Sequence, residues 1–236
     1  MPWNLINTIK SPSKKGVVER WVAVGGGGLI AYSSNGNNWT AAATKGGITY
    51  AYGVAYGAGA ARWVAVGQGS IIAYSSDGNN WTQAASKGGL TNGYGVAYGT
   101  NGAGVGRWVA VGSGGTIAYS SDGNNWTQAA SKGGISTGAV DVAYGTNGAG
   151  VGRWVAVSYG GTIAYSSDGN NWTAAASAGG LTFVSGVAYG TNGAGVGRWV
   201  AVGNGSPIAY SSDGNNWTAA ASDGGLTTGG GVAFNN

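Results

Sequence analysis

The stretch RWVAVGSGGTIAYSSDGNNW, residues 107–126, contains the pattern that decides the fold. It begins with Arg-Trp-Val-Ala-Val, passes through small residues to Ile-Ala-Tyr-Ser, and ends in a polar run followed by a second Trp. In every copy the two Trp are 18 positions apart, as in Trp63 and Trp81. Repetition at a period of about 40 to 50 residues is typical of propellers and solenoids. Five copies of the first segment are present, and they begin at Arg20, Arg62, Arg107, Arg153 and Arg198.

Each unit is expected to form four short β-strands. Its segments are rich in Val, Ile, Tyr, Trp and Thr, which favour strands, and Gly, Asn, Asp and Ser between them favour turns. In the Arg-Trp-Val-Ala-Val segment, Trp and Ala face one side and the two Val the other, so both sides are apolar, as in a strand between stacked sheets. The sequence therefore predicts an all-β, five-bladed β-propeller of four-stranded antiparallel blades, with a β-solenoid as the alternative.

The ends of the chain indicate how such a ring would close. The Gly-Val-Ala-Tyr-Gly motif of the first strand has its last copy at residues 231–235, after the fifth unit, and no clear copy precedes Trp21. We therefore predict that this C-terminal strand completes the N-terminal blade, whereas a solenoid would have atypical capping repeats. The propeller is expected to span residues 20–236, with residues 1–19 as an N-terminal tail or an extra strand.

Composition excludes several classes of function. The chain has no cysteine and no histidine, which removes disulfides, thiolate metal sites and the commonest general base. Its charge of +4 includes no basic run longer than Lys14-Lys15, so we expect no nucleic acid as partner. No apolar stretch is long enough to span a bilayer and no signal-peptide h-region is present, so we expect no membrane insertion. These features leave the localisation open, with a virion surface among the candidates.

The polar run Ser-Ser-Asp-Gly-Asn-Asn-Trp resembles the Asp-box, or BNR repeat, of sialidase-like propellers. Here Trp follows Asp by four residues, one fewer than in the usual Asp-box, and the first copy has Asn in place of Asp. The resemblance implies a structural turn between the third and fourth strands, in which Asp accepts backbone hydrogen bonds and Trp packs between blades. The five-bladed organisation is also similar to the tachylectin type of lectin, although that family's blade motif is not visible. The expected turn residues are Asn35, Asp77, Asp122, Asp168 and Asp213, with Trp39, Trp81, Trp126, Trp172 and Trp217.

The same sequence predicts a protein without catalytic activity. A glycosidase requires a pair of carboxylates, and a sialidase in addition an arginine triad and a Tyr-Glu pair. The only Glu is Glu19, and outside the turns only Asp141 and Asp223 remain. The five Arg all precede a Trp at the same repeat position, which indicates a structural role. We therefore expect no catalytic residues, no cofactor and no metal.

Variation between the units indicates where a ligand would bind. The turns between second and third strands and the linkers between units should emerge on one face, and they differ from unit to unit. The opposite face repeats Thr-Asn-Gly-Ala-Gly-Val-Gly-Arg almost unchanged. Loops on a rigid scaffold commonly bind ligands, and aromatic rings stack on sugars or fill a partner's pockets. Alternatively, the aromatic residues wedge between blades and the Lys only aid solubility. The predicted ligand-binding residues of this variable face are Tyr50, Tyr52, Tyr94, Tyr159, Phe183, Lys45, Lys87 and Lys132.

These features favour a lectin-like function for the chain. We expect a non-catalytic, multivalent carbohydrate-binding or receptor-binding propeller, because repeated shallow sites combine weak affinities through avidity. The alternative is a structural or adhesion component of a larger assembly, such as a virion or a phage tail. The expected partners are a glycan, a cell-surface receptor or assembly proteins, and a homo-oligomer is compatible with either function.

Overall fold

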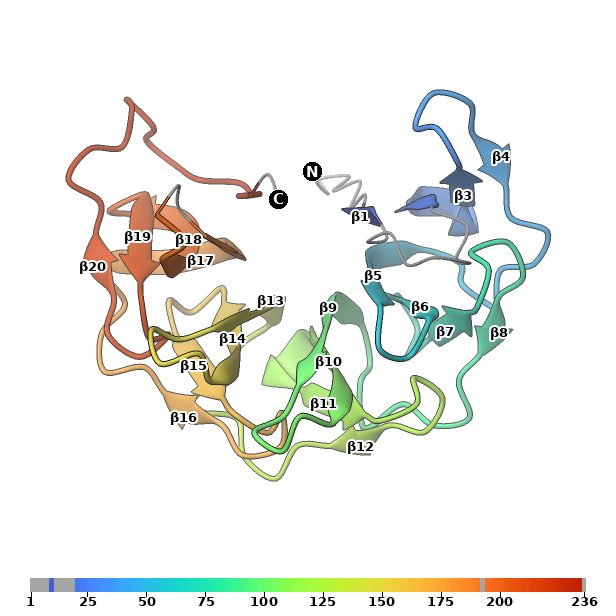
Figure 1. Cartoon of the computed structure of the whole chain (residues 1–236), viewed down its shortest axis with the longest axis horizontal. Coiled ribbons are helices and arrows are strands. Elements are labelled where there is room, and N and C mark those ends of the chain that lie inside the picture. The colour runs from blue at the N-terminus through green and yellow to red at the C-terminus, as the bar shows by residue number, and fades with distance from the viewer. Residues whose placement is uncertain (1–8, 11–19, 192–193, 235–236) are drawn as a thin grey trace.

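The computed structural model describes residues 9–10, 20–191 and 194–234. These residues contain five antiparallel sheets of four strands each, arranged side by side in an arc (Figure 1). The first sheet consists of β1 (Ile9–Lys10), β2 (Trp21–Val24), β3 (Ile30–Ser33) and β4 (Thr40–Ala41), and the second of β5 (Ala51–Gly57), β6 (Arg62–Gly67), β7 (Ile72–Ser75) and β8 (Thr82–Gln83). The third contains β9 (Gly93–Thr100), β10 (Gly106–Gly112), β11 (Ile117–Ser120) and β12 (Thr127–Gln128). The fourth contains β13 (Ala139–Thr146), β14 (Gly152–Ser158), β15 (Ile163–Ser166) and β16 (Thr173–Ala174), and the fifth β17 (Leu181–Thr191), β18 (Gly197–Gly205), β19 (Ile208–Ser211) and β20 (Thr218–Ala219).

Within each sheet the strands follow one another in chain order, from the inner strand to the outer edge of the arc (Figure 1). Two short 3-10 segments, η1 (Gly26–Gly28) and η2 (Ser113–Gly115), form turns between second and third strands. The prediction of a five-bladed, all-β propeller is confirmed by these five sheets. In the described part of the chain, no helix has the length and apolarity needed to cross a membrane.

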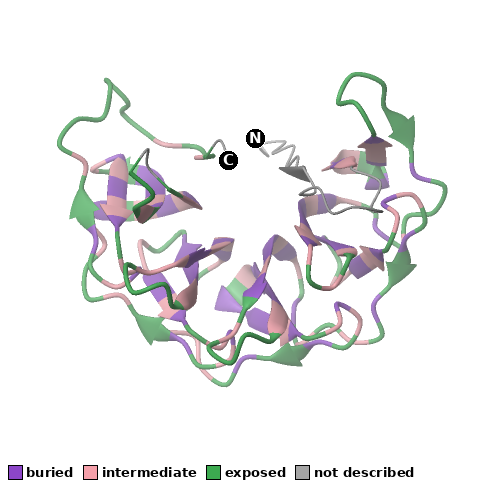
Figure 2. Cartoon of the chain, in the orientation of Figure 1, coloured by how far each residue is buried: buried purple, intermediate pink, exposed green. Residues whose placement is uncertain are grey.

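The core lies between adjacent sheets. In β10, the side chains of Trp108, Val109, Ala110 and Val111 are all inaccessible to solvent, as predicted for a strand that is apolar on both sides. Val109 and Val111 pack with Trp154 of the next sheet, so each interface uses one side of each sheet. Figure 2 shows that buried residues are concentrated in the inner strands and exposed residues on the outer strands and loops. Burial of a Val side chain such as Val109 or Val111 stabilises the fold by about 1.5 to 3 kcal/mol.

The first sheet differs from the predicted closure of the ring. Its inner strand is β1, which pairs with β2 through Ile9 opposite Val22 and Lys10 opposite Trp21. β1 falls within residues 1–19, the segment expected to be a tail or an extra strand. Its place in the first sheet was not predicted, because Ile9 and Lys10 lack the Gly-Val-Ala-Tyr-Gly motif. Residues 226–234 form no strand. They lie against the fifth sheet instead, where the ring of Phe234 packs on the backbone of β17, so the arc is open in this structure.

Candidate functional site

Each of the four inner strands β5, β9, β13 and β17 contains a bulge at the same repeat position. In β5 the register moves from Ala51 opposite Gly67 to Gly53 opposite Val66, which leaves Tyr52 without an opposing residue. A bulge of this kind re-aims the side chain of the extra residue. The extra residues at this repeat position are Tyr52, Tyr94, Val140 and Ser185, so two of the equivalent positions have an aromatic ring.

The aromatic residues predicted to bind a ligand form contacts with one another. The rings of Tyr50 and Tyr52 have centroids 4.8 Å apart, and Tyr52 meets Tyr94 edge-on at 5.5 Å. Farther along the arc, Tyr159 and Phe183 have centroids 4.9 Å apart. These distances are those of favourable aromatic pairs.

Gly138 joins the two groups of rings. A Cβ atom built on Gly138 would lie 3.3 Å from Cδ2 of Tyr159 and 3.6 Å from Cε2 of Tyr94, so this glycine lies between the two rings. The five aromatic residues therefore form one series that extends from the second sheet to the fifth. We call this series the aromatic arc; its members are Tyr50, Tyr52, Tyr94, Tyr159 and Phe183.

The members of the aromatic arc differ in exposure. Tyr159 is 48% exposed, whereas the other four rings are half-buried. Tyr50 also packs over the first sheet, since a Cβ on Gly26 would lie 2.9 Å from its ring. This end of the arc fits the wedge alternative, whereas Tyr159 is the exposed member of the arc. Burial, and then the nearby Tyr50 and Tyr94, raise the pKa of Tyr52, so its hydroxyl remains a hydrogen-bond donor at neutral pH.

Hydrogen bonds between turns and linkers hold the backbone around the arc. The amide of Gln68 donates to the carbonyl of Tyr50 at 2.9 Å, and the amide of Gly69 donates to Oδ1 of Asn92 at 3.1 Å. On the next sheets, the Thr91 and Ser113 hydroxyls are 2.5 Å apart, and the amide of Gly160 donates to Oγ1 of Thr137 at 3.1 Å. These bonds fix the turns and linkers beside the arc, and three of its five rings belong to the inner strands β5, β9 and β17.

Asp141 lies directly after the bulge residue of β13, at a position where the other inner strands have glycine. Its carboxylate accepts hydrogen bonds from the amides of Val142 at 2.8 Å and Val187 at 3.0 Å, and so connects β13 with β17. Burial raises the pKa of Asp141 to about 6, although both amide donors act in the opposite direction. Sequence reasoning counted Asp141 only as a leftover carboxylate; the signal for its position was the glycine in the equivalent repeats.

The three predicted Lys lie apart from the aromatic arc. Lys45 and Lys87 are exposed and Lys132 is half-buried. Each directly precedes a glycine that packs on the outer strands of the following sheet; a Cβ on Gly46, for example, would lie 2.7 Å from Ala73 and 3.0 Å from Thr82. The linker that carries each Lys therefore starts near the outer edge, whereas the aromatic residues lie along the inner strands. The structure separates two groups of residues that the sequence placed in one site.

The Asp turns, residues 75–81 and their equivalents, are closed by their own side chains. Oδ1 of Asp77 accepts the amides of Asn79 and Asn80, both at 2.8 Å, and the Trp81 indole donates to the Gly78 carbonyl at 3.0 Å. In the first copy, Oδ1 of Asn35 accepts the two equivalent amides at 2.9 Å, so Asn replaces Asp in this turn without loss of the backbone bonds.

Electrostatics in these turns follow from the same bonds. Burial alone would raise the pKa of Asp122, but donors from the backbone and side chain of Asn125 and the amide of Asn124 outweigh it and lower the pKa to about 2. The pKa values of Asp77, Asp168 and Asp213 are lowered for the same reasons. These four carboxylates are therefore ionised and committed to the turns at neutral pH.

The repeated Arg also take part in contacts between sheets. The guanidinium of Arg62 lies over the ring of Tyr74, 4.5 Å from its centroid, and donates to the carbonyl of Asp122 on the next sheet. Among the described residues, no group of three or more His, Cys, Asp or Glu side chains could hold a metal ion. The arrangement of the described residues thus offers an aromatic surface and a network of structural turns.

No protein-family model matches the sequence, and no curated protein matches it significantly. Among solved structures, the GH74 enzyme of Niastella koreensis aligns at 22% identity and a TM-score of 0.59, over 84% of this chain and 29% of the enzyme. YCF48 bound to a D1 peptide aligns at 17% identity and a TM-score of 0.58, over 92% of this chain and 70% of that protein. Virginiamycin B lyase from Staphylococcus aureus aligns at 10% identity and a TM-score of 0.62, over 89% of this chain and 67% of the lyase.

At these identities the likeness shows a shared propeller fold and nothing finer. The chain spans less than a third of the length of the GH74 enzyme that it matches.

Proposed function

We propose that this chain is a non-catalytic binding propeller whose aromatic arc holds a glycan, as a lectin does. The observation that carries the proposal is the series of five rings, in which one group of three and one pair are in ring contact and Gly138 lies between the two groups. Flat, rigid rings of this kind provide a large apolar contact area at low entropic cost, and Tyr adds a hydroxyl donor. A chain of sugar units could stack on several rings in succession.

The aromatic arc supports one extended site in place of five equivalent ones. At the four bulge positions, Tyr occurs only in the second and third sheets, and Val140 and Ser185 replace it in the next two. In our proposal, multivalency therefore arises when a polymeric ligand contacts several rings at once. Our proposal leaves out the three Lys, because the glycine that follows each of them packs on the outer strands of the next sheet.

Our proposal assigns no chemistry to the described carboxylates. The four turn carboxylates each accept hydrogen bonds within their own turn, and we propose that these are structural turns of the Asp-box type. Asp141 accepts two backbone amides and thereby connects two sheets. A hydrolysis assay with a panel of oligosaccharides tests this part, since turnover that survives purification and disappears in Asp141→Asn would overturn it.

A glycan array followed by titration calorimetry tests the binding proposal. We expect a specific glycan to bind the wild-type chain and to lose at least about tenfold in affinity in Tyr159→Ser, because a few aromatic anchors carry most binding energy. The matched controls are Val105→Ser and Val151→Ser, which remove exposed apolar side chains from the loops after β9 and β13, on the opposite face. Equal loss in the controls, or no glycan bound at all, would contradict the proposal.

A second candidate function, docking in a larger assembly such as a virion, a phage tail or an adhesion structure, is favoured by the opposite face. The loops after β9, β13 and β17 present Val105, Val151 and Val196, which are 55%, 44% and 46% exposed. Oδ1 of Asn101 accepts the amides of Ala103 and Val105 and holds the first of these loops. If co-assembly is lost in the Val→Ser variants and glycans do not compete, this function replaces the lectin-like one.

A further inference from the structure

The contacts between adjacent sheets repeat four times around the arc. Between the second and third sheets, the amide of Ala85 donates to Oδ1 of Asn124 at 3.0 Å, and the Ser86 hydroxyl donates to the Trp126 carbonyl at 2.9 Å. The guanidinium of Arg62 donates to the Asp122 carbonyl. The equivalent Arg bonds of the other three interfaces are made by Arg20, Arg107 and Arg153.

The fifth sheet carries one half of this same interface at the end of the arc. Arg198 and Val200 occupy the positions of Arg62 and Val64, but Arg198 is exposed and Val200 half-buried, whereas Val64 is inaccessible to solvent. A Cβ on Gly224 would meet nothing within 4 Å, whereas a Cβ on the equivalent Gly133 would lie 2.6 Å from the next sheet. The fifth sheet therefore has the contact residues of an interface without a neighbouring sheet among the described residues.

The first sheet carries the other half. Trp39 is 40% exposed, whereas its counterparts Trp81, Trp126, Trp172 and Trp217 are 3% to 4% exposed. Trp21 and Ala23 are also half-buried, although their equivalents in the other four sheets are at most 2% exposed. The two ends of the arc therefore present the two complementary surfaces of one interface.

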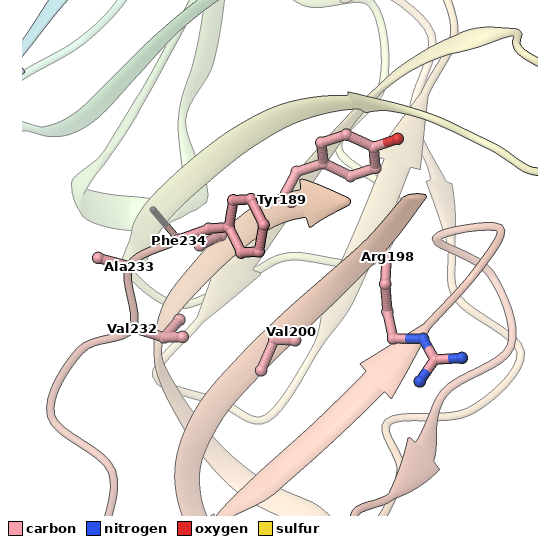
Figure 3. Close-up of a pocket in the computed structure, with 8 residues that line it drawn as sticks. Tyr189, Arg198, Val200, Val232, Ala233 and Phe234 are labelled. Atoms are coloured by element: carbon pink, nitrogen blue, oxygen red, sulfur yellow. The ribbon is translucent and has the colours of Figure 1, made fainter. Parts of the chain in front are cut away.

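The C-terminal residues already occupy the place of a next inner strand. A Cβ on Gly190 would lie 2.0 Å from the ring of Phe234, just as a Cβ on Gly145 would lie 2.1 Å from the ring of Tyr189. Phe234 thus takes the position that Tyr189 has one sheet earlier. Figure 3 shows Phe234, Val232 and Val200 around a pocket that also includes Arg198, at the point where the next sheet would pack.

The repeat also specifies which residues would pair. In all four complete repeats, the Tyr of the inner strand lies opposite the Trp of the second strand, as Tyr98 lies opposite Trp108 with ring centroids 4.8 Å apart. The same register puts Phe234 opposite Trp21 and Ala233 opposite Val22. These are the two residues of β2 that now pair with β1.

We propose that the first sheet docks on the fifth and closes the ring, and that residues 231–234 replace β1 on the edge of β2. The closed form makes the fifth copy of the interface: Arg198 donates to the Asn35 carbonyl, the amide of Ala221 donates to Oδ1 of Asn37, and the Ser222 hydroxyl donates to the Trp39 carbonyl. β1 and the C-terminal residues are thus alternative inner strands for one sheet, and their exchange releases Ile9 and Lys10 from the ring.

The chain's own first sheet is the occupant that this surface favours over a second copy. Both halves belong to the same chain and lie on either side of the one opening of the arc (Figure 1). Their contact is therefore intramolecular, and its effective concentration does not fall on dilution as that of a second copy does. If the fifth sheet docked on the first sheet of a second copy, this head-to-tail contact would form rings or filaments of several chains, whereas closure within one chain gives a monomer.

Engineered disulfides distinguish these arrangements, because the chain has no cysteine of its own. One variant combines Val22→Cys with Ala233→Cys, and a second combines Ala23→Cys with Val232→Cys. Opposed residues of an antiparallel pair alternate between wide and narrow spacing, so one of these pairs has the spacing that suits a disulfide. A third variant, Ile9→Cys with Val22→Cys, reports the pairing of β1.

We expect at least one of the first two variants to form a disulfide within a monomer, and the third to form it less completely. Disulfide-linked dimers or ladders would show that a second copy is the occupant. Free thiols in both closure variants together with efficient linkage in the third would show that β1 keeps its place; either result overturns the proposal.

Hydrogen exchange of the unmodified chain gives an independent readout if a variant fails to fold. In the closed form alternate amides of residues 231–234 are paired with β2. We expect these amides to exchange more than about tenfold slower than in Arg198→Ala plus Trp39→Ala, which weakens the fifth interface. Exchange as fast as in an unstructured peptide would contradict closure.

Discussion

Tyr52 meets Tyr94 edge-on across two sheets, with ring centroids 5.5 Å apart, although 42 positions separate them in the chain. Each ring is placed by a bulge that leaves its residue unpaired in its own sheet. An aromatic pair of this kind stabilises by about 0.5 to 1.5 kcal/mol beyond its buried area. The half-buried members of the aromatic arc therefore serve both stability and the proposed site, and a clean test of binding must use its exposed member.

Tyr159→Ser is that test. Because the Tyr159 side chain is 48% exposed, we expect its loss to change the free energy of unfolding by no more than about 1 kcal/mol. Tyr94→Ser should cost more, since it removes contacts with Tyr52 and with Gly138. Chemical denaturation of both variants checks the order, and a larger loss in Tyr159→Ser would show that this ring is an inter-sheet wedge.

Trp126→Ala should strongly destabilise the fold. The Trp126 side chain is 4% exposed, packs in the core between the second and third sheets and donates to the Gly123 carbonyl at 3.0 Å. We expect a loss of about 3 to 5 kcal/mol in the free energy of unfolding. The adjacent Thr127 is exposed, so Thr127→Ala should stay within about 0.5 kcal/mol and serves as the control.

Asp141 should make the chain less stable as the pH rises toward neutrality. Its pKa is raised in the fold to about 6 from an ordinary 3.8, so its contribution is fully present below about pH 3.8 and is lost as the pH rises through 6. We expect the free energy of unfolding to fall by up to about 3 kcal/mol over this window, at about 1.4 kcal/mol per pKa unit. In Asp141→Asn the free energy of unfolding should no longer fall between pH 4 and 7. An unchanged pH dependence in this variant would show that another group causes the fall.

The turn carboxylates should stabilise the fold at neutral pH and lose this effect in acid, opposite to Asp141. The pKa of Asp122 is lowered to about 2, so its stabilising effect is present above the ordinary pKa of 3.8 and is lost as the pH falls through 2. Asp122→Asn should keep the two backbone bonds, as Asn35 does, and reduce acid sensitivity between about pH 4 and 2. Acid unfolding monitored by circular dichroism checks this prediction. Asp223→Asn is the control, because Asp223 lies outside the Asp turns.

The strand pattern was predictable because it depends on local chemistry. The alternation of Trp, Val, Ala and Val, with a fixed interval to the second Trp, specifies two strands and their turn, and the structure buries both sides of β10. The contacts within the aromatic arc were not predictable, since they depend on a register shift that leaves Tyr52 unpaired. The separation of Lys45 from Tyr50 also escaped prediction, because the linker crosses from the outer strands to the inner edge within five residues.

Gly133→Ala and Gly224→Ala test ring closure through stability alone. Both glycines have a positive φ, 56° and 65°, so an Ala at either position costs about 1 to 2 kcal/mol in backbone strain. At Gly133 the added methyl also meets Ala164 at 2.6 Å, which should add about 1 to 3 kcal/mol. In the closed ring, Gly224 would face Ala31 and Thr40 in the same way, so we expect the two variants to lose equal stability in urea denaturation. A Gly224→Ala variant that loses only the backbone strain would show that the arc stays open in solution.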